Sequence, residues 1–275
     1  MIVVSGATGN VGRPLVRALV AAGEQVTAVS RRIGESDVPD GVRHHRADVA
    51  DPEGLAPVLD GADALFLLTS GDLMLAGGHV HGVLDAARAG GVGRVVLLSS
   101  QGVGTRRHPS RYEDAVKESA PRWTMLRPGG FASNAFLWAG PVRERRTVSA
   151  PFGDTALPVV DPTDIAEVAA AALREPGHAG ATYVLTGPAP LTPRQQAAAI
   201  GDAIGEEVRF VEQSSAEARE QLTRFMPAQV VDSTLAVLGT PTADEQRVSP
   251  DVERVLGRPP RTFADWAARN AAAFK

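Results

Sequence analysis

Apolar, β-branched runs alternate with stretches of helical periodicity over the first half of the chain. Between the first two runs, apolar residues recur at helical spacing from Val11 to Val20, and Gly23 can end this helix in a left-handed conformation. Alternation of this kind is typical of βαβ units around a parallel sheet that is buried on both faces. The pattern predicts a Rossmann-type α/β fold with a doubly wound parallel sheet and strands over residues 2–5, 26–30, 42–47, 64–69, 95–100 and 124–127.

The strict alternation ends near residue 130, where a second region is expected to begin. We predict a sheet domain over residues 1–130 and a smaller C-terminal α+β lobe over 131–275, some segments of which return to the sheet domain. In this lobe the pattern predicts a strand over 157–160, a helix from the N-cap Thr192 to Ile204 and a last helix with Thr262 as N-cap and Asp265 at the capping-box position.

Composition narrows the classes of function that this fold could serve. Acidic and basic residues nearly balance, with a formal net charge of -4, so no basic field favours nucleic acid or anionic lipid. The chain has no cysteine, which excludes disulfides and thiolate catalysis. No apolar run approaches the roughly 20 residues that a transmembrane helix needs. These observations favour a cytoplasmic protein that binds neither nucleic acid nor membranes.

The histidines form two close pairs that resemble metal ligands. His44 and His45 are adjacent on a predicted strand and therefore point to opposite faces. His79 and His81 are two residues apart on a predicted helix and point to different sides. No metal site is predicted, because neither pair can converge on one ion.

A glycine-rich turn links the first predicted strand to the first predicted helix. A strand that enters G-x-x-G-x-x-G and then a helix brings unpaired backbone amides and the positive end of the helix dipole to one point. Gly6 permits the tight turn, Gly9 removes a Cβ that would block a phosphate, and Gly12 lets the helix approach the strand. The turn predicts a dinucleotide whose pyrophosphate contacts Gly6, Thr8, Gly9, Asn10, Val11 and Gly12.

The end of the second strand indicates which dinucleotide is preferred. An NAD-specific site places Asp or Glu here, whereas this chain has Ser30-Arg31-Arg32. A guanidinium can bind a 2′-phosphate that a carboxylate would repel, so we predict that NADP(H) is preferred over NAD(H) and that Arg31 contacts it. The alternative is that both arginines are solvated loop charges.

Three further strand ends carry candidate cofactor contacts. Asp48, followed by Val49, could accept a hydrogen bond from the adenine amino group, or it could cap the next helix. The runs 68–70 and 99–101 could face the ribose and nicotinamide, or their hydroxyls could bind local backbone. The predicted contacts at these three ends are Asp48, Val49, Leu68, Thr69 and Ser99.

The glycine turn, the arginine pair, Ser99-Ser100-Gln101-Gly102 and the run 123–131 with Asn134 together resemble a known family. The chain is similar to the NmrA-like atypical short-chain dehydrogenases/reductases over nearly its whole length, including residues 161–166 and 185–188. The resemblance implies an NADP(H)-binding domain, a substrate lobe and a small-molecule substrate. It also implies cofactor contacts for the glycine turn, Arg31, Asp48 and Phe131.

The residues expected for alcohol chemistry are incomplete. Conventional short-chain reductases use a tyrosine as general acid with a lysine four residues later. Here Tyr112 is followed at that spacing by Val116, and Lys117 lies about 100° further around a helix. Gln101 stands where the family's reactive hydroxyl is expected. Tyr112 is therefore only a weak catalytic candidate, and the other catalytic residues are not identified.

Three functions remain after this departure. The favoured one is an NADPH-dependent reductase of a quinone or enone, in which proximity drives hydride transfer and the proton comes from water or a pocket group. The second is a non-catalytic NADP(H)-sensing regulator of the NmrA type, in which cofactor binding alters a surface for a protein partner. The third is a nucleotide-sugar epimerase or dehydratase, which would also need the missing tyrosine–lysine pair. The sequence leaves open whether the chain forms a homodimer.

Overall fold

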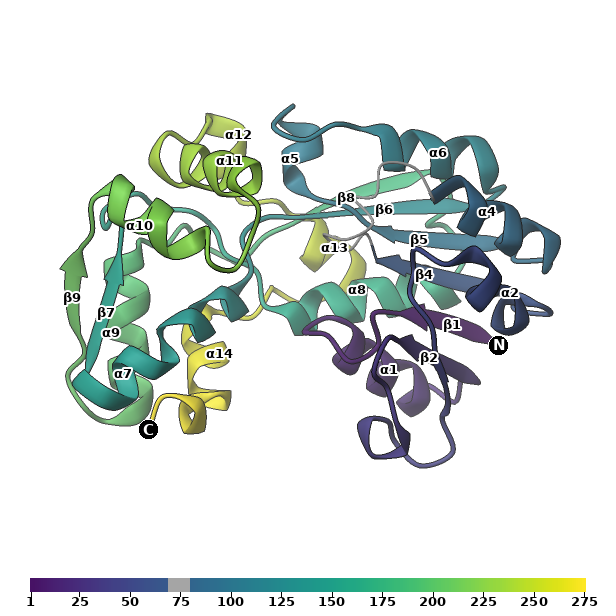
Figure 1. Ribbon diagram of the computed structural model, residues 1–275, viewed down its shortest axis with the longest axis horizontal. Coiled ribbons are helices and arrows are strands. Elements are labelled where there is room, and N and C mark those ends of the chain that lie inside the picture. The colour runs from purple at the N-terminus through teal and green to yellow at the C-terminus, as the bar shows by residue number, and fades with distance from the viewer. Residues whose placement is uncertain (69–79) are drawn as a thin grey trace. The chain divides into compact units, whose positions relative to one another are not determined.

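The computed structural model describes residues 1–68 and 80–275, which form two compact units (Figure 1). Unit 1 consists of Met1–Pro128, Pro162–Leu185 and Asp251–Arg258. Unit 2 consists of Gly129–Asp161, Thr186–Pro250 and Pro259–Lys275. The chain therefore crosses between the units several times.

Unit 1 contains a seven-stranded parallel sheet of order β3-β2-β1-β4-β5-β6-β8 (Figure 1). Its central strands are buried and apolar, as expected for a parallel sheet with both faces covered. The strands are β1 (Ile2–Ser5), β2 (Val26–Ser30), β3 (Arg43–Arg46), β4 (Ala64–Leu68), β5 (Arg94–Leu98), β6 (Trp123–Pro128) and β8 (Ala181–Leu185). The predicted Rossmann-type α/β class is confirmed.

Helices cover both faces of this sheet. On one face α1 packs against α8, and on the other α2 packs against α4, which in turn contacts α6. A core of buried aliphatic side chains lies between the sheet and the second group of helices. Within the described residues, the helices of unit 1 are α1 (Gly12–Ala21), α2 (Pro52–Leu59), α4 (Val80–Ala89), α5 (Gln101–Gly104), α6 (Arg111–Ser119), α8 (Pro162–Arg174) and α13 (Asp251–Leu256), with the 3-10 helix η1 (Glu35–Asp37).

Unit 2 combines a short parallel strand pair with several helices around its own core. The strands β7 (Thr147–Ala150) and β9 (Arg209–Glu212) pair with each other, which the sequence did not predict. The ring of Trp266 makes an edge contact with Phe136, with ring centroids 4.9 Å apart. The helices are η2 (Ala132–Trp138), α7 (Ala139–Arg145), α9 (Pro193–Ile204), α10 (Ser215–Leu222), α11 (Ala228–Gly239), α12 (Ala243–Gln246), α14 (Phe263–Arg269) and η3 (Ala271–Ala273).

The predicted strand over 157–160 is wrong. Leu157 makes an isolated bridge with Leu191, and Val160 makes another with Phe131, but no strand forms between them. Pro158 interrupts the segment because proline has no N–H to donate to a ladder. The predicted N-caps are confirmed: Thr192 accepts from the N–H of Gln195 and Thr262 from that of Asp265.

Every helix within residues 1–68 and 80–275 is too short or too polar to cross a membrane.

Candidate cofactor-binding site

The β1–α1 corner of unit 1 is a tight turn held by backbone hydrogen bonds. The N–H of Ala7 donates to the carbonyl of Val29 on β2 at 3.0 Å, and that of Gly9 donates to Gly6 O at 2.9 Å. Gly6 has a φ of 64°, which side-chain-bearing residues rarely adopt. The backbone thus turns directly from β1 toward the start of α1.

The three glycines of this corner are needed for different steric reasons. A Cβ on Gly12 would overlap the carbonyl oxygen of Gly6 and lie 2.7 Å from Ala7 Cα, so the backbone would have to move. A Cβ on Gly6 would overlap the side chain of Leu68 at the end of β4. Gly9 is exposed, and a Cβ there would meet only Gly6 O at 3.2 Å. The fold itself demands Gly6 and Gly12 more strictly than Gly9, whose bare surface is open to a ligand.

Helix α1 begins without a side-chain cap. Its N-cap residue, Val11, makes no capping hydrogen bond, and no acidic residue lies in the first turn. In contrast, Asp51 caps α2 by accepting from Gly54 N–H at 3.1 Å. The first N–H groups of a helix have no acceptor within the helix, and the helix dipole makes this end positive. At this corner the N–H of Arg13 already donates to Gly9 O at 3.0 Å, and Pro14 has no N–H. The corner fits a pyrophosphate through the positive end of the helix dipole and the bare backbone at Gly9.

Arg13, which the sequence analysis missed, braces the corner. Its Nε donates to the carbonyl of Thr8 at 2.9 Å, and its Nη2 lies 3.4 Å from Asp37 Oδ1. The hydroxyls of Thr8 and Ser30 are hydrogen-bonded at 2.9 Å, which ties the turn to the end of β2. The available signal was a positive side chain in the first turn of a helix, where the dipole disfavours it.

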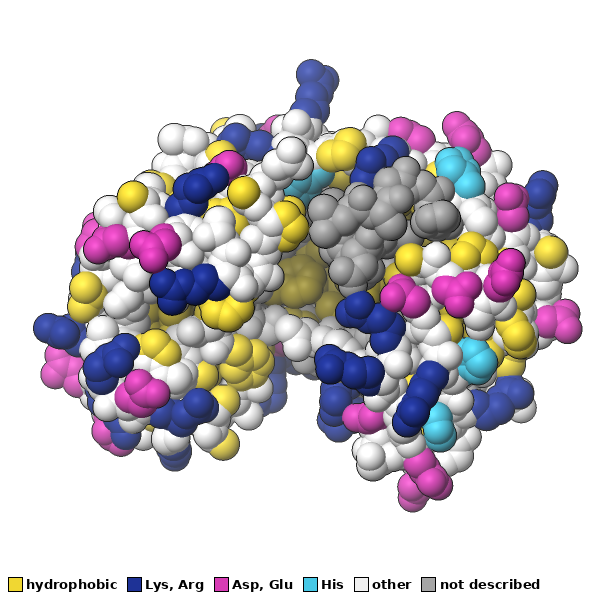
Figure 2. All heavy atoms as spheres, viewed as in Figure 1, with side chains coloured by type: hydrophobic (Ala, Val, Ile, Leu, Met, Phe, Trp, Pro, Cys, Tyr) yellow, Lys and Arg dark blue, Asp and Glu magenta, His cyan; other side chains and the backbone are white. Residues whose placement is uncertain are grey.

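Basic side chains gather over α1 and the end of β2 in unit 1 (Figure 2). Strand β2 ends at Ser30, and Arg31 and Arg32 follow it. None of these three positions carries an acidic residue. The acidic residues Glu35 and Asp37 follow in η1, and Asp37 Oδ2 accepts from Gly34 N–H at 3.0 Å. The exposed arginines of this region are Arg13, Arg17, Arg31 and Arg32.

The strand order places the other predicted contacts along one edge of the sheet. Asp48 and Val49 follow β3, Leu68 ends β4 and Ser99 follows β5, whereas Thr69 lies outside the described residues. Asp48 Oδ1 accepts from Ala50 N–H at 2.9 Å, so it closes a local turn, and Asp51 caps the following helix. The side chain of Val49 packs on the core of unit 1.

Ser99 belongs to a partly buried polar cluster at the ends of β5 and β6, with the buried Glu113 at its centre. Its hydroxyl donates to Glu113 Oε1 at 2.6 Å. Arg127 donates to both carboxylate oxygens of Glu113, from Nε at 2.8 Å and from Nη2 at 2.6 Å. The Glu113 side chain is 1% exposed and that of Arg127 22%. The Ser99 hydroxyl thus uses its proton in the hydrogen bond to Glu113. It can only accept a hydrogen bond from a ligand at this edge of the sheet.

Electrostatics keep this cluster ionised. Burial opposes the charge on Glu113, but hydrogen bonds from Arg127 and Ser99, with the nearby Arg127 and Lys117 charges, outweigh it and lower the pKa of the carboxyl. The pKa of Arg127 is raised by its hydrogen bond to Glu113. Sequence reasoning missed Glu113 and Arg127, because the pair joins α6 to the end of β6 and has no local spacing signature.

Two further predicted residues, Tyr112 and Phe131, belong to other elements than the β1–α1 corner. Tyr112 on α6 is 7% exposed and packs in the core of unit 1, with Arg111 donating to its hydroxyl at 3.2 Å. Phe131 belongs to unit 2, where it pairs with Val160 in an isolated parallel bridge.

Comparisons with known proteins identify the family of this chain. A family model described as NAD(P)H-binding matches residues 6–176. The chain is 37% identical to the (4-alkanoyl-5-oxo-2,5-dihydrofuran-3-yl)methyl phosphate reductase of Streptomyces griseus, with 100% of this chain and 99% of that protein covered. The chain belongs to the NAD(P)H-binding family. The NmrA-like short-chain reductase resemblance is thereby confirmed.

A further relative and a solved structure agree with an NAD(P)H-binding chain of this fold. The chain is 32% identical to the NAD(P)H azoreductase of Xenophilus azovorans, with 100% of this chain and 99% of that protein covered. The solved structure of the NADPH-dependent quinone oxidoreductase of Escherichia coli with NADPH has a TM-score of 0.82 at 24% identity, covering 98% of this chain and 99% of that one. The chain is thus an NAD(P)H-binding protein, and its relatives include reductases of small molecules.

Proposed function

We propose that this chain is an NADPH-dependent reductase of small molecules with a conjugated, electron-poor double bond, of the quinone or enone type. The observation that carries the proposal is the uncapped glycine corner beside Ser30-Arg31-Arg32, which lacks the carboxylate of an NAD-specific site. When bound, the nicotinamide cofactor supplies a hydride. The α1 amides hold the pyrophosphate, and Arg31 binds the 2′-phosphate.

The acceptor class follows from which side chains can donate a proton. Tyr112 is buried in the core, and the Ser99 hydroxyl donates to Glu113, so neither resembles the free acid of an alcohol dehydrogenase. A conjugated acceptor does not need that acid, because hydride addition gives a delocalised anion such as an enolate or phenolate. This anion is much less basic than the localised alkoxide of an isolated ketone, and water can protonate it. Such an acceptor suits a site in which neither Tyr112 nor Ser99 offers a free proton.

The names of two relatives support this chemistry. The 5-oxo-2,5-dihydrofuran of the Streptomyces griseus reductase is a ring whose double bond is conjugated to a carbonyl, and the Xenophilus azovorans enzyme is named for azo reduction. Both name a polarisable double bond rather than an isolated alcohol or ketone. We therefore propose that the acceptor of this chain also has a polarisable, conjugated double bond.

The test follows loss of NADPH absorbance with quinones, enones, azo compounds and isolated ketones at equal concentrations. We expect turnover with the conjugated acceptors and at least tenfold lower kcat/KM with isolated ketones, because the latter need a strong proton donor. Tyr112→Phe should retain this turnover, provided that its thermal midpoint matches that of the native chain. Faster reduction of isolated ketones would contradict the acceptor class. Tight NADPH binding without turnover on any acceptor would instead favour the NADP(H)-sensing function.

A further inference from the structure

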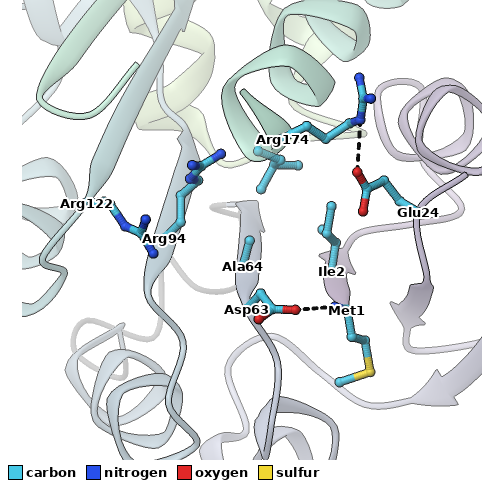
Figure 3. A pocket seen from close by; sticks show the side chains of 9 residues that line it. Met1, Ile2, Glu24, Asp63, Ala64, Arg94, Arg122 and Arg174 are labelled. Carbon is cyan, nitrogen blue, oxygen red and sulfur yellow. Dashed lines mark hydrogen bonds and ion pairs between the residues drawn. The ribbon is translucent and has the colours of Figure 1, made fainter. Parts of the chain in front are cut away.

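A pocket lies at the amino ends of β1, β4 and β5 in unit 1 (Figure 3). The glycine corner follows β1 at the opposite, carboxyl edge of the sheet. The volume of the pocket is about 220 Å³, and Ile2, Ala64 and Leu173 provide apolar lining. Charged side chains surround these apolar residues. Ligands of open α/β sheets normally bind at the carboxyl ends of the strands, so this pocket is separate from the cofactor site.

Two arginines of this pocket lie near each other without a carboxylate partner. Arg94, at the start of β5, donates from Nη1 to Ala172 O in the last turn of α8 at 3.2 Å. Arg122, just before β6, donates from Nε to Gly93 O at 3.0 Å. Among residues 1–68 and 80–275, no carboxylate forms a salt bridge with either guanidinium. Each arginine therefore keeps several N–H donors that no protein anion uses.

The remaining charges of the pocket do not neutralise this pair. Glu24 is bound by Arg174, whose Nε lies 3.1 Å from Glu24 Oε1. Asp63 is paired with the amino group of Met1 (Figure 3). Both carboxylates are thus matched by other cations, and the charges of Arg94 and Arg122 are left over. Burial and repulsion from Arg122 together lower the pKa of Arg94.

We propose that this pocket binds a small oxyanion, inorganic phosphate or a phosphomonoester, through the guanidinium groups of Arg94 and Arg122. Planar guanidinium groups match phosphate oxygens with parallel, charge-assisted hydrogen bonds. An anion between them would also relieve their mutual repulsion. The chain has a net charge of -4, so the attraction is local to this pocket and not a property of the whole surface.

The experiment measures the thermal midpoint of the full chain, tagged at its C-terminus so that the Met1 amino group stays intact. Phosphate is titrated against chloride at equal ionic strength, with saturating NADP⁺ present so that the glycine corner is occupied. We expect phosphate to raise the midpoint by about 2 °C or more near saturation. β-Glycerophosphate tests the phosphomonoester source in a parallel titration, and a response to either ligand supports the site.

The variants Arg122→Gln and Arg94→Gln test the assignment. Each should weaken the apparent phosphate affinity about tenfold or more, because charge-assisted hydrogen bonds are lost. Arg122 is exposed, so its variant should fold even if loss of the Arg94 contact to α8 unfolds the other, and NADP⁺ binding reports that it has folded. Arg88→Gln, which removes an exposed arginine of α4 outside the pocket, is the matched control. An unchanged phosphate response in folded Arg122→Gln, or a chloride response equal to that of phosphate, would overturn the proposal.

Discussion

The carboxyl edge of the sheet in unit 1 has two halves that treat their polar groups in opposite ways. At the ends of β1 and β2, the first amides of α1 have no side-chain cap and the glycines leave the backbone bare. At the ends of β5 and β6, Ser99, Glu113 and Arg127 satisfy one another in a partly buried cluster. The first half leaves its backbone bare for a ligand, whereas the second uses its side-chain donors to hold its own elements together.

This difference implies different kinds of sensitivity to mutation. The glycine half depends on the absence of atoms, so an added methyl group is harmful there. The Ser99–Glu113–Arg127 cluster depends on a buried charge that must stay paired, so removal of one partner is harmful there. Loss of cofactor binding should therefore come from the first half, and loss of stability with normal cofactor affinity from the second.

The largest effect is expected for Gly12→Ala, which should abolish detectable NADPH binding and lower the free energy of unfolding by about 3 kcal/mol. The added Cβ would overlap the Gly6 carbonyl and displace the start of α1. Fluorescence titration with NADPH and chemical denaturation measure the two effects. Gly140→Ala on α7 is the matched control, because its Cβ would meet nothing within 4 Å. Native-like NADPH affinity in Gly12→Ala would show that the glycine half of the edge does not depend on the missing Cβ.

The next effect is expected for Glu113→Gln, which should lower the free energy of unfolding by about 2 kcal/mol. The substitution leaves the partly buried Arg127 without its counter-charge. NADPH affinity should change less than threefold, because the cluster does not include the glycine corner. Glu118→Gln, an exposed change on the same helix, is the control and should be near neutral. A loss of NADPH affinity well beyond threefold in Glu113→Gln would show that the two halves of the edge act as one cofactor site.

The difference in the free energy of unfolding between the native chain and Glu113→Gln should depend on pH. The pKa of Glu113 is lower in the folded chain than its usual value of 4.5, so the folded state favours the carboxylate. The stability that Glu113 contributes is therefore fully present above that usual value and is lost as pH falls through the lowered pKa. Denaturation of the native chain and Glu113→Gln from neutral pH downward should show a constant gap that narrows in acid. A gap that widens in acid would contradict the sign of the shift.

A smaller effect is expected for Arg31→Ala, which should weaken NADPH binding about tenfold and leave NADH binding within twofold. Only NADPH carries the 2′-phosphate that a guanidinium would bind. Calorimetric titration with both cofactors measures the split, and Arg17→Ala serves as an exposed arginine control on α1. Equal losses for the two cofactors would remove the basis for NADP(H) preference.

The smallest effect is expected for Ser30→Ala, which should lower the free energy of unfolding by about 1 kcal/mol. It removes the 2.9 Å hydrogen bond between the Ser30 and Thr8 hydroxyls that ties the glycine turn to β2. Chemical denaturation measures the change, with Ser36→Ala, an exposed serine of η1, as the control. No difference between the two variants would show that this hydrogen bond contributes nothing to the corner.

The sequence by itself determined the features that depend on neighbouring residues. Strand and helix periodicity predicted the alternating core, the glycine spacing predicted the β1–α1 corner, and Thr192 and Thr262 marked helix starts, because each of these is set by backbone geometry over a few residues. Only the tertiary structure decided which distant groups meet. In the folded chain Ser99 donates to Glu113, Arg13 donates to the carbonyl of Thr8, and Arg94 lies near Arg122. The order and register of the strands bring together residues that no local sequence pattern connects.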